Sequence, residues 1–456
     1  MTQRRPVTPV DSMWLAQDRP NNLMVINAVM FLDGPVDVGR LDDVLRRRLV
    51  ARFPVFHQRP VRRANRWFWE DDPDFALDRH VHHSGLPRPG TDVALRRYVE
   101  QHMTEPLDFS RPLWQLHVVG GYRVGRRLTS ALLVRVHHSL ADGIALAQVL
   151  LTLTDEHPDA DTRAAHDIAP RVPREPGVSL VRRLPQRALG TLAGAVRAVP
   201  ALPVQAIRTI EVADKLVLGT EPRSRLTRRP GVRKRVAWSG PLPLADVRIT
   251  ARQAGVTIND VLMCGVAGVV RRYLDDSGSG VADLTTMVPV NLRPADQPLP
   301  AALGNRFTLV LLRLPATISD PAERLAETAR RMDRIKDSPE VALTFTLING
   351  IGLLPHQVGR AAVDFFASKA FGVTTNVIGP TNDRYLAGVR VSGVLGWVPG
   401  SGQHCLGVCL FTYAGTLRVG FAADAGAVPD PQVLVEAFET ELDGLLRAVR
   451  SGAGRS

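Results

Sequence analysis

The stretch RVHHSLADGIALAQ, residues 135–148, joins a predicted strand to a predicted helix through a short polar turn. The segment SALLVRVHH, residues 130–138, is almost continuously apolar, which is typical of a strand in the centre of a sheet. Residues 143–154 then predict a helix. Ligand sites in α/β folds commonly lie where strands end in a crevice. The sequence therefore places His137 and His138 where side chains can carry chemistry.

Alternation along the strand sends the side chains of His137 and His138 to opposite faces, so only one can point into a given channel. An imidazole has an ordinary pKa of about 6.5 and is therefore suited to accept a proton at neutral pH. Asp142 follows in the turn, where its carboxylate can fix a ring tautomer or pair with an arginine. Gly143 lets the backbone turn into the helix without a steric cost.

A metal site is the competing chemical interpretation, because two histidines and an aspartate are good ligands. Adjacent histidines on one strand converge poorly on a single ion, and the sequence has no further ligand cluster beside them. We therefore predict no metal, and a purely structural histidine pair is the other alternative. A second group, His80, His82 and His83, precedes the turn SGLPRPG and predicts exposed loop side chains.

The rest of the chain alternates between predicted strands and helices on both sides of a basic central segment. Apolar residues at helical spacing predict helices, whereas apolar or alternating runs predict strands. The predicted helices cover residues 38–53, 93–104, 143–154, 244–255, 257–274, 320–336, 339–368 and 429–449. The predicted strands cover residues 25–34, 114–121, 130–138, 284–294, 306–314, 372–379, 404–413 and 417–424. This order indicates an α/β protein of mixed α+β type with two halves.

Length and composition describe a globular protein of two domains. The 456 residues exceed one ordinary domain, and 45% hydrophobic with 22% charged residues allow substantial cores. No apolar signal region follows the N-terminal MTQRRPVTP, and no run of about 20 apolar residues predicts a membrane-spanning helix. The three cysteines, Cys264, Cys405 and Cys409, form no CxxC pair, which favours a reduced, cytosolic location.

Positive charge is concentrated in residues 163–235, which contain 16 Lys or Arg and 5 Asp or Glu, a net of +11. The remaining residues contain 41 basic and 40 acidic side chains, so this connector carries almost the whole net charge of +12. Its apolar part, RALGTLAGAVRAVPALPVQAIRTI (187–210), predicts docking on an anionic membrane or lipid body. A solvated linker is the alternative. No nucleic-acid motif accompanies the arginines, so nucleic acid is not an expected partner.

The turn HHSLADG has the pattern HHxxxDG, and other short motifs occur in order along the chain. They are VTPVDSMWLAQDRPNNLMVINAVMFLDG (7–34), RPLW (111–114), TIND (257–260), MVPVNLRP (287–294), GNRF (304–307) and TTNVIGP (374–380). HHxxxDG is the active-site motif of the CoA-dependent acyltransferase superfamily, which includes chloramphenicol acetyltransferase and the condensation domains of peptide synthetases. With the other motifs, nearly the full chain resembles the bacterial wax ester synthase/diacylglycerol acyltransferases.

The resemblance implies two chloramphenicol-acetyltransferase-like domains with mixed sheets and an active-site channel between them. The expected domains are residues 1–162, which carry HHxxxDG, and residues 236–456, which lack a histidine motif, joined by the connector 163–235. The implied reaction transfers a fatty acyl group from acyl-CoA, the co-substrate, to diacylglycerol or a long-chain alcohol, without a cofactor. The implied location is cytoplasmic, with peripheral attachment to the inner membrane face or to lipid inclusions.

The motifs also imply roles for individual residues. His138 is the expected general base, supported by His137 and Asp142, and Gly143 completes the motif. In condensation domains an arginine pairs with the motif aspartate, and the candidates for that structural role are Arg59 and Arg293. Thr375 and Asn376 are candidate donors to the oxyanion that forms during acyl transfer. The residues expected at the substrate are Trp114, Asn259, Asp260, Thr375 and Asn376.

Several of these roles have a structural alternative. Trp114 can simply bury its indole at the start of a strand, and Asn259 and Asp260 can cap a helix. The chain also departs from the family pattern: His57 stands where arginine is common, and Ile378 stands where proline is usual. Two other functions stay open, namely the same fold acylating a specialised alcohol such as a sugar or polyketide, and a non-catalytic protein that binds lipid droplets or acyl chains.

Overall fold

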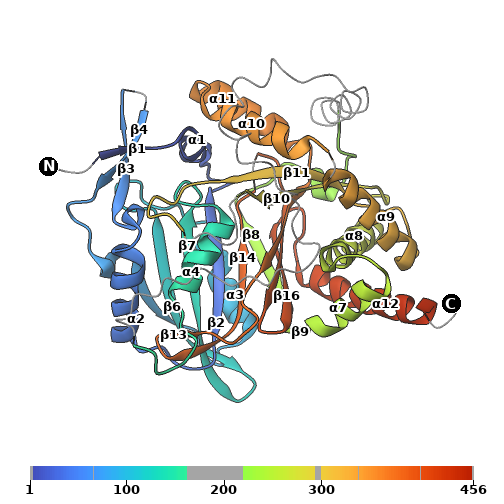
Figure 1. Ribbon diagram of the computed structural model, residues 1–456, viewed down its shortest axis with the longest axis horizontal. Helices are drawn as coiled ribbons and strands as arrows, with labels where there is room; N and C mark the ends of the chain where they lie inside the picture. Colours follow the sequence, from blue (N-terminus) through green and yellow to red (C-terminus); the bar gives the residue numbers. More distant parts are fainter. Residues whose placement is uncertain are drawn as a thin grey trace.

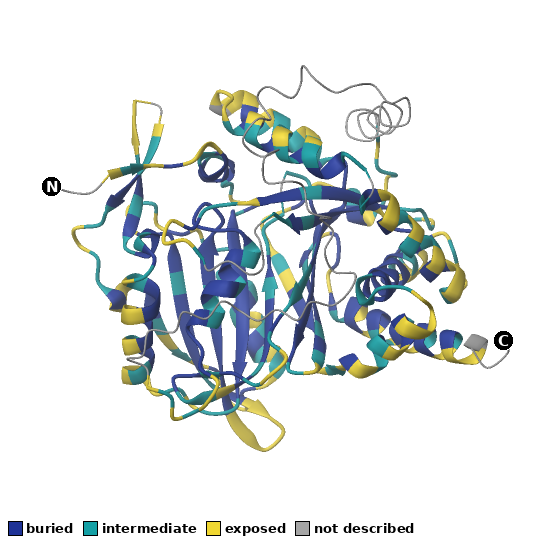
Figure 2. Cartoon of the chain, in the orientation of Figure 1, coloured by how far each residue is buried: buried dark blue, intermediate teal, exposed yellow. Residues whose placement is uncertain are grey.

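The computed structural model describes residues 4–64, 66–161, 219–292, 299–336, 338–400 and 402–453. Two large sheets form the two halves of the molecule, and a small three-stranded sheet lies beside the first (Figure 1). The strands of both large sheets are mostly buried, whereas many helical residues are exposed (Figure 2). The predicted fold class, a mixed α/β protein with mixed sheets, is confirmed.

The first large sheet has six strands in the order β13-β14-β2-β7-β6-β5. Their bounds are Tyr385–Leu386 (β13), Val389–Trp397 (β14), Val25–Leu32 (β2), Arg127–His137 (β7), Trp114–Val124 (β6) and Val81–Gly85 (β5). Neighbouring strands are antiparallel except β5 and β6, which run parallel. All eight residues of β2 are buried, so β2 and the β7 strand beside it lie in the centre of the core.

A strand from the second half of the sequence completes this first sheet. β14 pairs antiparallel with β2, with Leu395 opposite Val29 and Trp397 opposite Asn27. The predicted division at residues 1–162 and 236–456 therefore does not hold for residues 385–397, which cross to the first sheet. The rest of that division stays a prediction, and residues 162–218 of the connector lie outside the described residues.

Four of the described helices belong to the first half of the sequence, and each begins with a side chain that accepts a hydrogen bond from its first turn. The helices are α1 (Pro9–Gln17), α2 (Val38–Val44, continued by a π-helical turn over Leu45–Val50), α3 (Asp92–Met103) and α4 (Gly143–Thr152). The capping residues are Thr8, Asp37, Thr91 and Asp142. Such caps satisfy backbone N–H groups that have no partner inside the helix. The small sheet contains β1 (Arg4–Pro6), β4 (Arg66–Asp71) and β3 (Gln58–Arg63).

The second large sheet has seven strands and mixed direction. Its main order is β11-β10-β12-β15-β16-β8, and β9 pairs with β16. The bounds are Phe307–Arg313 (β11), Thr285–Asn291 (β10), Gly372–Ile378 (β12), Leu406–Tyr413 (β15), Thr416–Asp424 (β16), Lys234–Trp238 (β8) and Leu242–Pro243 (β9). β12 runs parallel to both β10 and β15, and the other pairs are antiparallel.

Six of the described helices belong to the second half of the sequence. They are α7 (Leu244–Gln253), α8 (Ile258–Asp276), α9 (Pro321–Lys336), α10 (Glu340–Gly352), α11 (His356–Ala367) and α12 (Gln432–Ala453). α8 has 12 of its 19 residues buried, which makes it the central helix of this half. The predicted helix over 339–368 is wrong as one helix: it is broken between Gly352 and His356, because Pro355 cannot continue the preceding helix.

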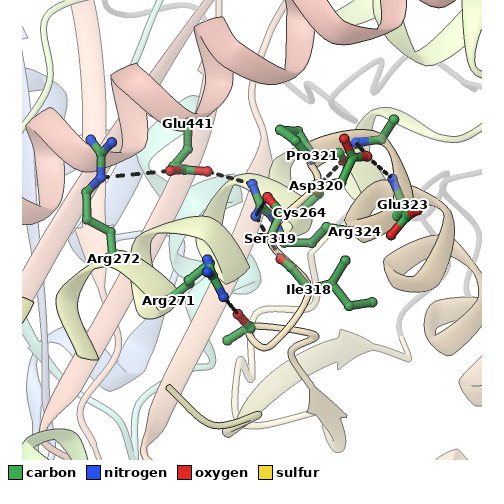
Figure 3. Close-up of polar contacts among 12 residues, drawn as sticks. Cys264, Arg271, Arg272, Ile318, Ser319, Asp320, Pro321, Glu323, Arg324 and Glu441 are labelled. Atoms are coloured by element: carbon green, nitrogen blue, oxygen red, sulfur yellow. Dashed lines mark hydrogen bonds and ion pairs between the residues drawn. The ribbon is translucent and has the colours of Figure 1, made fainter. Parts of the chain in front are cut away.

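A buried ion pair connects two of these helices (Figure 3). Arg324 on α9 donates to the Glu441 carboxylate on α12 at 2.5 Å and to the carbonyls of Ile318 and Ser319. The Arg324 side chain is only 2% exposed, so these partners must replace the water that would otherwise stabilise its positive charge. Gly268 on α8 provides the space, because a Cβ at that position would collide with the Glu441 side chain.

Candidate active site

His138 follows the last residue of β7 and continues the strand pairing by one residue. Its backbone N–H donates to the carbonyl of Met24 at 2.7 Å, beside the paired residues Val25 and His137. His137 has 0% exposed surface, whereas His138 keeps 5%. His138 is therefore the only one of the two histidines with a surface that another molecule can touch.

Two aromatic rings from distant parts of the chain pack on the imidazole of His138. Trp14 of α1 lies 4.5 Å away between ring centroids, with the planes at 26°, and Phe307 of β11 lies 5.6 Å away at 43°. Such ring pairs contribute about 0.5–1.5 kcal/mol beyond their buried area. The two rings fix the plane of the imidazole and surround it with apolar atoms.

Burial lowers the pKa of His138 below its ordinary value, against raising effects from its own backbone carbonyl, Asp142 and Asn305. The imidazole is therefore neutral at pH 7, which is the form that can accept a proton. Its Nδ1 atom is buried. Nε2 is thus the ring nitrogen available to a reacting group.

His137 has a supporting position. Its Nδ1 atom accepts from the backbone N–H of Ser139 at 3.2 Å and lies 2.8 Å from the Ser139 hydroxyl. Its Nε2 atom lies 3.9 Å from the carboxylate of Asp18. Burial lowers the pKa of His137 to about 3, so the ring stays neutral, and its contacts with Ser139 stabilise the turn that follows β7.

Asp142 holds the turn and the helix behind it. One carboxylate oxygen accepts from the N–H of Ala145 at 2.8 Å, and the other accepts from the N–H of Arg306 at 3.0 Å. Gly143 starts α4 without the left-handed backbone that favours glycine, so the predicted conformational reason is wrong. A Cβ at Gly143 would instead lie 3.1 Å from Val398, and close packing is the reason for glycine here.

The two predicted arginine partners of Asp142 have different outcomes. Arg59 lies on β3, and its guanidinium donates to the carbonyl of Ser110 at 3.4 Å, so it does not form the predicted pair with Asp142. Arg293 lies outside the described residues. In the described part of the chain, no group of three or more His, Cys, Asp or Glu side chains is arranged to hold a metal ion.

Trp114 occupies the core rather than an open channel. Its indole N–H donates to the carbonyl of Phe56 at 2.8 Å, and its ring stacks on His80 at 4.7 Å. With 2% exposure, Trp114 supports the start of β6, in agreement with its structural alternative, and a contact with substrate stays a prediction. The predicted exposed loop at His80 is also wrong: His80 is buried, and His82 and His83 lie on β5.

The remaining predicted substrate residues divide into two groups. Asp260 exchanges hydrogen bonds with Thr257 in a capping box at the start of α8, and the Thr375 hydroxyl donates to Val408 inside the sheet. These two side chains are used structurally. Asn376 donates to Asn259 at 2.9 Å, and both line a cavity of about 100 Å³. Neither asparagine contacts His138, and His138 is not among the residues that line this cavity.

The turn after β7 is also held by the segment Gly304–Phe307 from the second half of the sequence, with the order GNRF. Gly304 donates its N–H to the carbonyl of Leu140 at 3.0 Å, and Arg306 donates to Asp142 as described above. Phe307 then packs on the His138 ring in a tilted arrangement. Sequence reasoning quoted GNRF and the Trp14 segment as motifs without a role, since nothing local indicates that they meet at His138.

No single helix among the described residues is long and apolar enough to cross a membrane. α7 and α8 taken together have the length and the apolar composition of a membrane-spanning segment, and the two helices meet at a bend of 103°.

Known proteins share this fold over nearly the whole chain. The wax ester synthase/diacylglycerol acyltransferase from Marinobacter aquaeolei VT8 superimposes with a TM-score of 0.70 at 21% identity, covering 98% of this chain and 99% of that one. The first condensation domain of the calcium-dependent antibiotic synthetase superimposes with a TM-score of 0.61 at 18% identity, covering 98% and 96%. Fold and HHxxxDG turn together define a protein of the chloramphenicol-acetyltransferase-like class.

Sequence comparison specifies the family within that class. Residues 7–262 match the wax ester synthase/diacylglycerol acyltransferase catalytic domain, and residues 303–446 match the C-terminal domain. A Mycobacterium tuberculosis protein named a probable diacylglycerol O-acyltransferase is 31% identical over 466 residues, covering 97% of this chain and 98% of the relative. The chain belongs to the wax ester synthase/diacylglycerol acyltransferase family. Family and relatives together support an acyltransferase activity.

Proposed function

We propose that this chain transfers a fatty acyl group from acyl-CoA to the hydroxyl of diacylglycerol or of a long-chain alcohol, with His138 as general base. The observation that carries the proposal is the position of His138 after the end of β7, where Trp14 and Phe307 both pack on its imidazole and burial lowers its pKa. Relatives that are named as diacylglycerol O-acyltransferases support the substrate class.

In the proposed reaction His138 Nε2 takes the hydroxyl proton while the alcohol oxygen attacks the thioester carbonyl. A C–O bond forms, the C–S bond then breaks, and the leaving CoA sulfur receives the proton from the imidazolium. A thioester is already an activated acyl donor, so no covalent enzyme intermediate is needed. A positioned base contributes about 10²–10⁴-fold to the rate. The Thr375 hydroxyl already donates to Val408, and one N–H of the Asn376 amide donates to Asn259, so backbone N–H groups are further candidates for oxyanion stabilisation.

An apolar cluster around His138 supports a lipid substrate. Trp14 and Phe307 belong to a cluster that joins α1, β11 and the α10–α11 hairpin. The buried members of the cluster are Val10, Met13, Trp14, Met24, Phe307, Ile348, Ile351 and Val363. An acyl chain gains about 0.8 kcal/mol for each methylene that it buries, so such surroundings favour a long chain over a short one.

The outer side of the same hairpin supports attachment to a lipid surface. α10 and α11 lie at one edge of the molecule and expose many residues (Figure 2). The exposed large apolar side chains of the hairpin are Leu343 (36%), Leu353 (74%), Leu354 (43%), Val358 (53%) and Phe365 (43%). Five exposed large apolar side chains within one helical hairpin are the kind of surface that interacts with apolar partners. The predicted docking by residues 187–210 falls outside the described residues and stays a prediction.

The proposal is tested by His138→Ala, assayed for CoA-thiol release with labelled acyl-CoA and a panel of alcohols. The panel contains diacylglycerol, hexadecanol and a sugar. We expect activity of the wild type with one of the two lipids and a loss of about 10²-fold or more in the variant. His83→Ala is the matched control, because His83 is an exposed histidine on β5.

Activity of His138→Ala within a few-fold of the wild type would remove His138 as the base. Transfer to the sugar alone would favour the specialised-alcohol alternative. Binding to lipid droplets without thiol release for any acceptor would favour the non-catalytic alternative. Circular dichroism and a thermal melt of the variant show whether a loss of activity reflects chemistry or unfolding.

A further inference from the structure

The small three-stranded sheet carries a local excess of positive charge. Strands β1, β3 and β4 together contain six arginines and two acidic residues, a net of +4. The whole chain outside residues 163–235 has a net charge of only +1. The charge of this sheet is therefore concentrated there and is not a property of the surface in general.

Strand pairing shows which way these side chains face. Trp69 on β4 is only 1% exposed, so its face of the sheet packs against the body of the protein. Residues that lie opposite one another, or two positions apart on a strand, share a face. The other face is named here the arginine face, and its charged residues are Arg4, Arg59, Arg63, Arg66 and Glu70.

The single carboxylate of the arginine face does not balance its guanidinium groups. An oxygen of Glu70 lies 2.6 Å from Nε of Arg4 and 3.2 Å from Nε of Arg63. Arg63 and Arg66 are exposed and lie directly opposite each other across the β3–β4 pair. Like charges in this position destabilise a sheet. An arrangement that opposes folding is expected where side chains serve binding, and an anion beside the two guanidiniums would relieve the repulsion.

Apolar side chains share the arginine face. Pro6 and Val61 both lie opposite Phe68; Pro6 is exposed, and Val61 and Phe68 are half-buried. A free phosphate is recognised by charge and hydrogen bonds and has no use for apolar neighbours. Headgroup phosphates of a lipid surface lie above acyl chains, so basic and apolar side chains together fit a lipid surface.

The arginine face continues into the exposed apolar hairpin of α10 and α11. β1 ends at Pro6, and α1 begins at Pro9. A Cβ at Gly352, the last residue of α10, would lie 2.7 Å from the backbone of Pro9, so the turn of the hairpin touches the start of α1. Both features lie along the upper edge of the molecule (Figure 1).

Helix α1 connects this edge to the candidate base. Trp14 packs on the imidazole of His138. Asp11 accepts a hydrogen bond from the Asn305 amide at 2.7 Å, and the same amide nitrogen donates to the carbonyl of His138 at 2.7 Å. A lipid surface that contacts both the arginine face and the hairpin would therefore lie beside the helix that packs on His138.

We propose that the arginine face binds the anionic headgroups of a lipid surface, while the α10–α11 hairpin buries its exposed leucines and valines beside them. The two contacts together orient the protein with α1 toward the lipid. The inference rests on the proposed function, because a lipid acceptor is dissolved in such a surface.

The first test measures binding without an acyl donor. Full-length protein is sedimented with vesicles of phosphatidylcholine alone and of phosphatidylcholine mixed with phosphatidylglycerol. Arg63→Gln with Arg66→Gln removes two charges from the arginine face. Each basic side chain near an anionic surface contributes about 5-fold, so we expect the partition coefficient on the mixed vesicles to fall about 10-fold or more. On phosphatidylcholine alone it should equal that of the wild type.

Arg126→Gln with Arg127→Gln is the matched control. These arginines are also exposed at a hairpin turn, between β6 and β7, and this turn lies at the opposite edge of the molecule (Figure 1). The change in net charge is the same, but the distance from the lipid exceeds the screening length, so partitioning should stay within about 3-fold of the wild type.

The second test separates lipid binding from stability and from chemistry. Removing the repulsion between Arg63 and Arg66 should leave the melting temperature unchanged or higher. With an acceptor dispersed in neutral detergent, Arg63→Gln with Arg66→Gln should transfer acyl groups at the wild-type rate. With the acceptor in anionic vesicles, the rate should fall together with the partition coefficient.

Equal partitioning of the two double variants would overturn the inference, because only net charge would then matter. Binding of single-stranded RNA that Arg63→Gln with Arg66→Gln abolishes, without vesicle binding by the wild type, would assign the arginine face to nucleic acid instead. Failure of the proposed function is recognised differently: the wild type would transfer no acyl group in either medium, while its sedimentation with vesicles remained measurable.

Discussion

The indole of Trp14 lies 4.5 Å from the imidazole of His138, and the two rings are 26° from parallel. Trp14 belongs to the first helix, whereas His138 follows the strand β7 more than a hundred residues later. The contact packs the N-terminal helix directly on the candidate base. It also removes water from one face of the ring, and this burial lowers the pKa of His138.

Trp14→Ala should therefore raise the pKa of His138 toward its ordinary value of about 6.5. A base with a higher pKa is protonated at a higher pH, so the acid limb of the kcat/KM profile should move upward in pH. The measurement is kcat/KM from pH 5 to pH 8. Trp14→Phe is the control, because it keeps a stacked ring; identical profiles for the wild type and Trp14→Ala would contradict this explanation.

Buried neutral histidines should make the protein less stable in mild acid. Burial lowers the pKa of His117 and of His137 to about 3, and that of His404 to about 4. In the unfolded chain these groups titrate at about 6.5, so below that pH the unfolded state binds more protons. Each group then lowers the free energy of unfolding by about 1.4 kcal/mol per pH unit, until the pH reaches the lowered pKa.

Urea unfolding at pH 7, 6 and 5 measures this effect. His117→Gln should reduce the slope of stability against pH, because one buried neutral histidine is removed. The exposed His83 gives the matched control, because His83→Gln removes a histidine that is not buried. A slope that is the same in all three proteins would show that His117 does not contribute.

The Arg324–Glu441 contact should behave as a buried ion pair (Figure 3). Glu441→Gln leaves the guanidinium of Arg324 without its counter-charge and should cost about 3–5 kcal/mol in the free energy of unfolding. The pair Arg450–Asp246 has a contact of similar length, 2.6 Å, but its side chains are about half exposed, so Asp246→Asn should cost about 1 kcal/mol or less. Equal losses for the two variants, measured by urea unfolding, would argue against the burial explanation.

Replacing the exposed apolar residues of the α10–α11 hairpin should weaken attachment to lipid. Leu353→Ser with Val358→Ser removes two side chains that are 74% and 53% exposed, so folding should be little affected. We expect at least a 5-fold lower partition coefficient on vesicles that contain diacylglycerol and anionic lipid, measured by sedimentation. Val93→Ser with Val124→Ser is the control, because these valines are 54% and 56% exposed but lie far from the hairpin in the sequence.

A deletion of residues 187–210 distinguishes the hairpin from the basic connector. Lower partitioning of the deletion, with the hairpin variant unaffected, would assign docking to the connector instead. Loss in both would mean that the apolar hairpin and the basic segment act together. An unchanged partition coefficient in both would remove the docking proposal.

Most helices and strands follow from local sequence, and the exceptions have physical reasons. Helix α8 and strand β7 lie within three residues of their predicted bounds, because a continuous apolar run and a Thr257 cap define them locally. β14 was not predicted, since Gly393 and Gly396 interrupt its apolar alternation and the strand bulges at that point. Its stability comes from pairing with β2, which no window of local sequence contains.

Some residues of the candidate site also follow from local sequence, and others do not. The turn HHSLADG alone indicated His138 rather than His83, because a buried strand and a capped helix flank the turn. Sequence reasoning did not find Asp11, Asn305 or Phe307 as site residues, because their own neighbours give them ordinary roles in a helix, a loop and a strand. Trp114 was placed at the substrate by its motif, but the indole is satisfied in the core.

The amino-acid order by itself determined the secondary structure around the HHxxxDG turn and the family pattern, because alternation and helix capping act over a few residues. Only the tertiary structure decided which distant groups surround His138. Trp14, Asn305 and Phe307 meet there through sheet pairing and helix packing, in which residues more than a hundred positions from His138 exclude water together. A contact of that kind depends on the whole fold and therefore has no local signal.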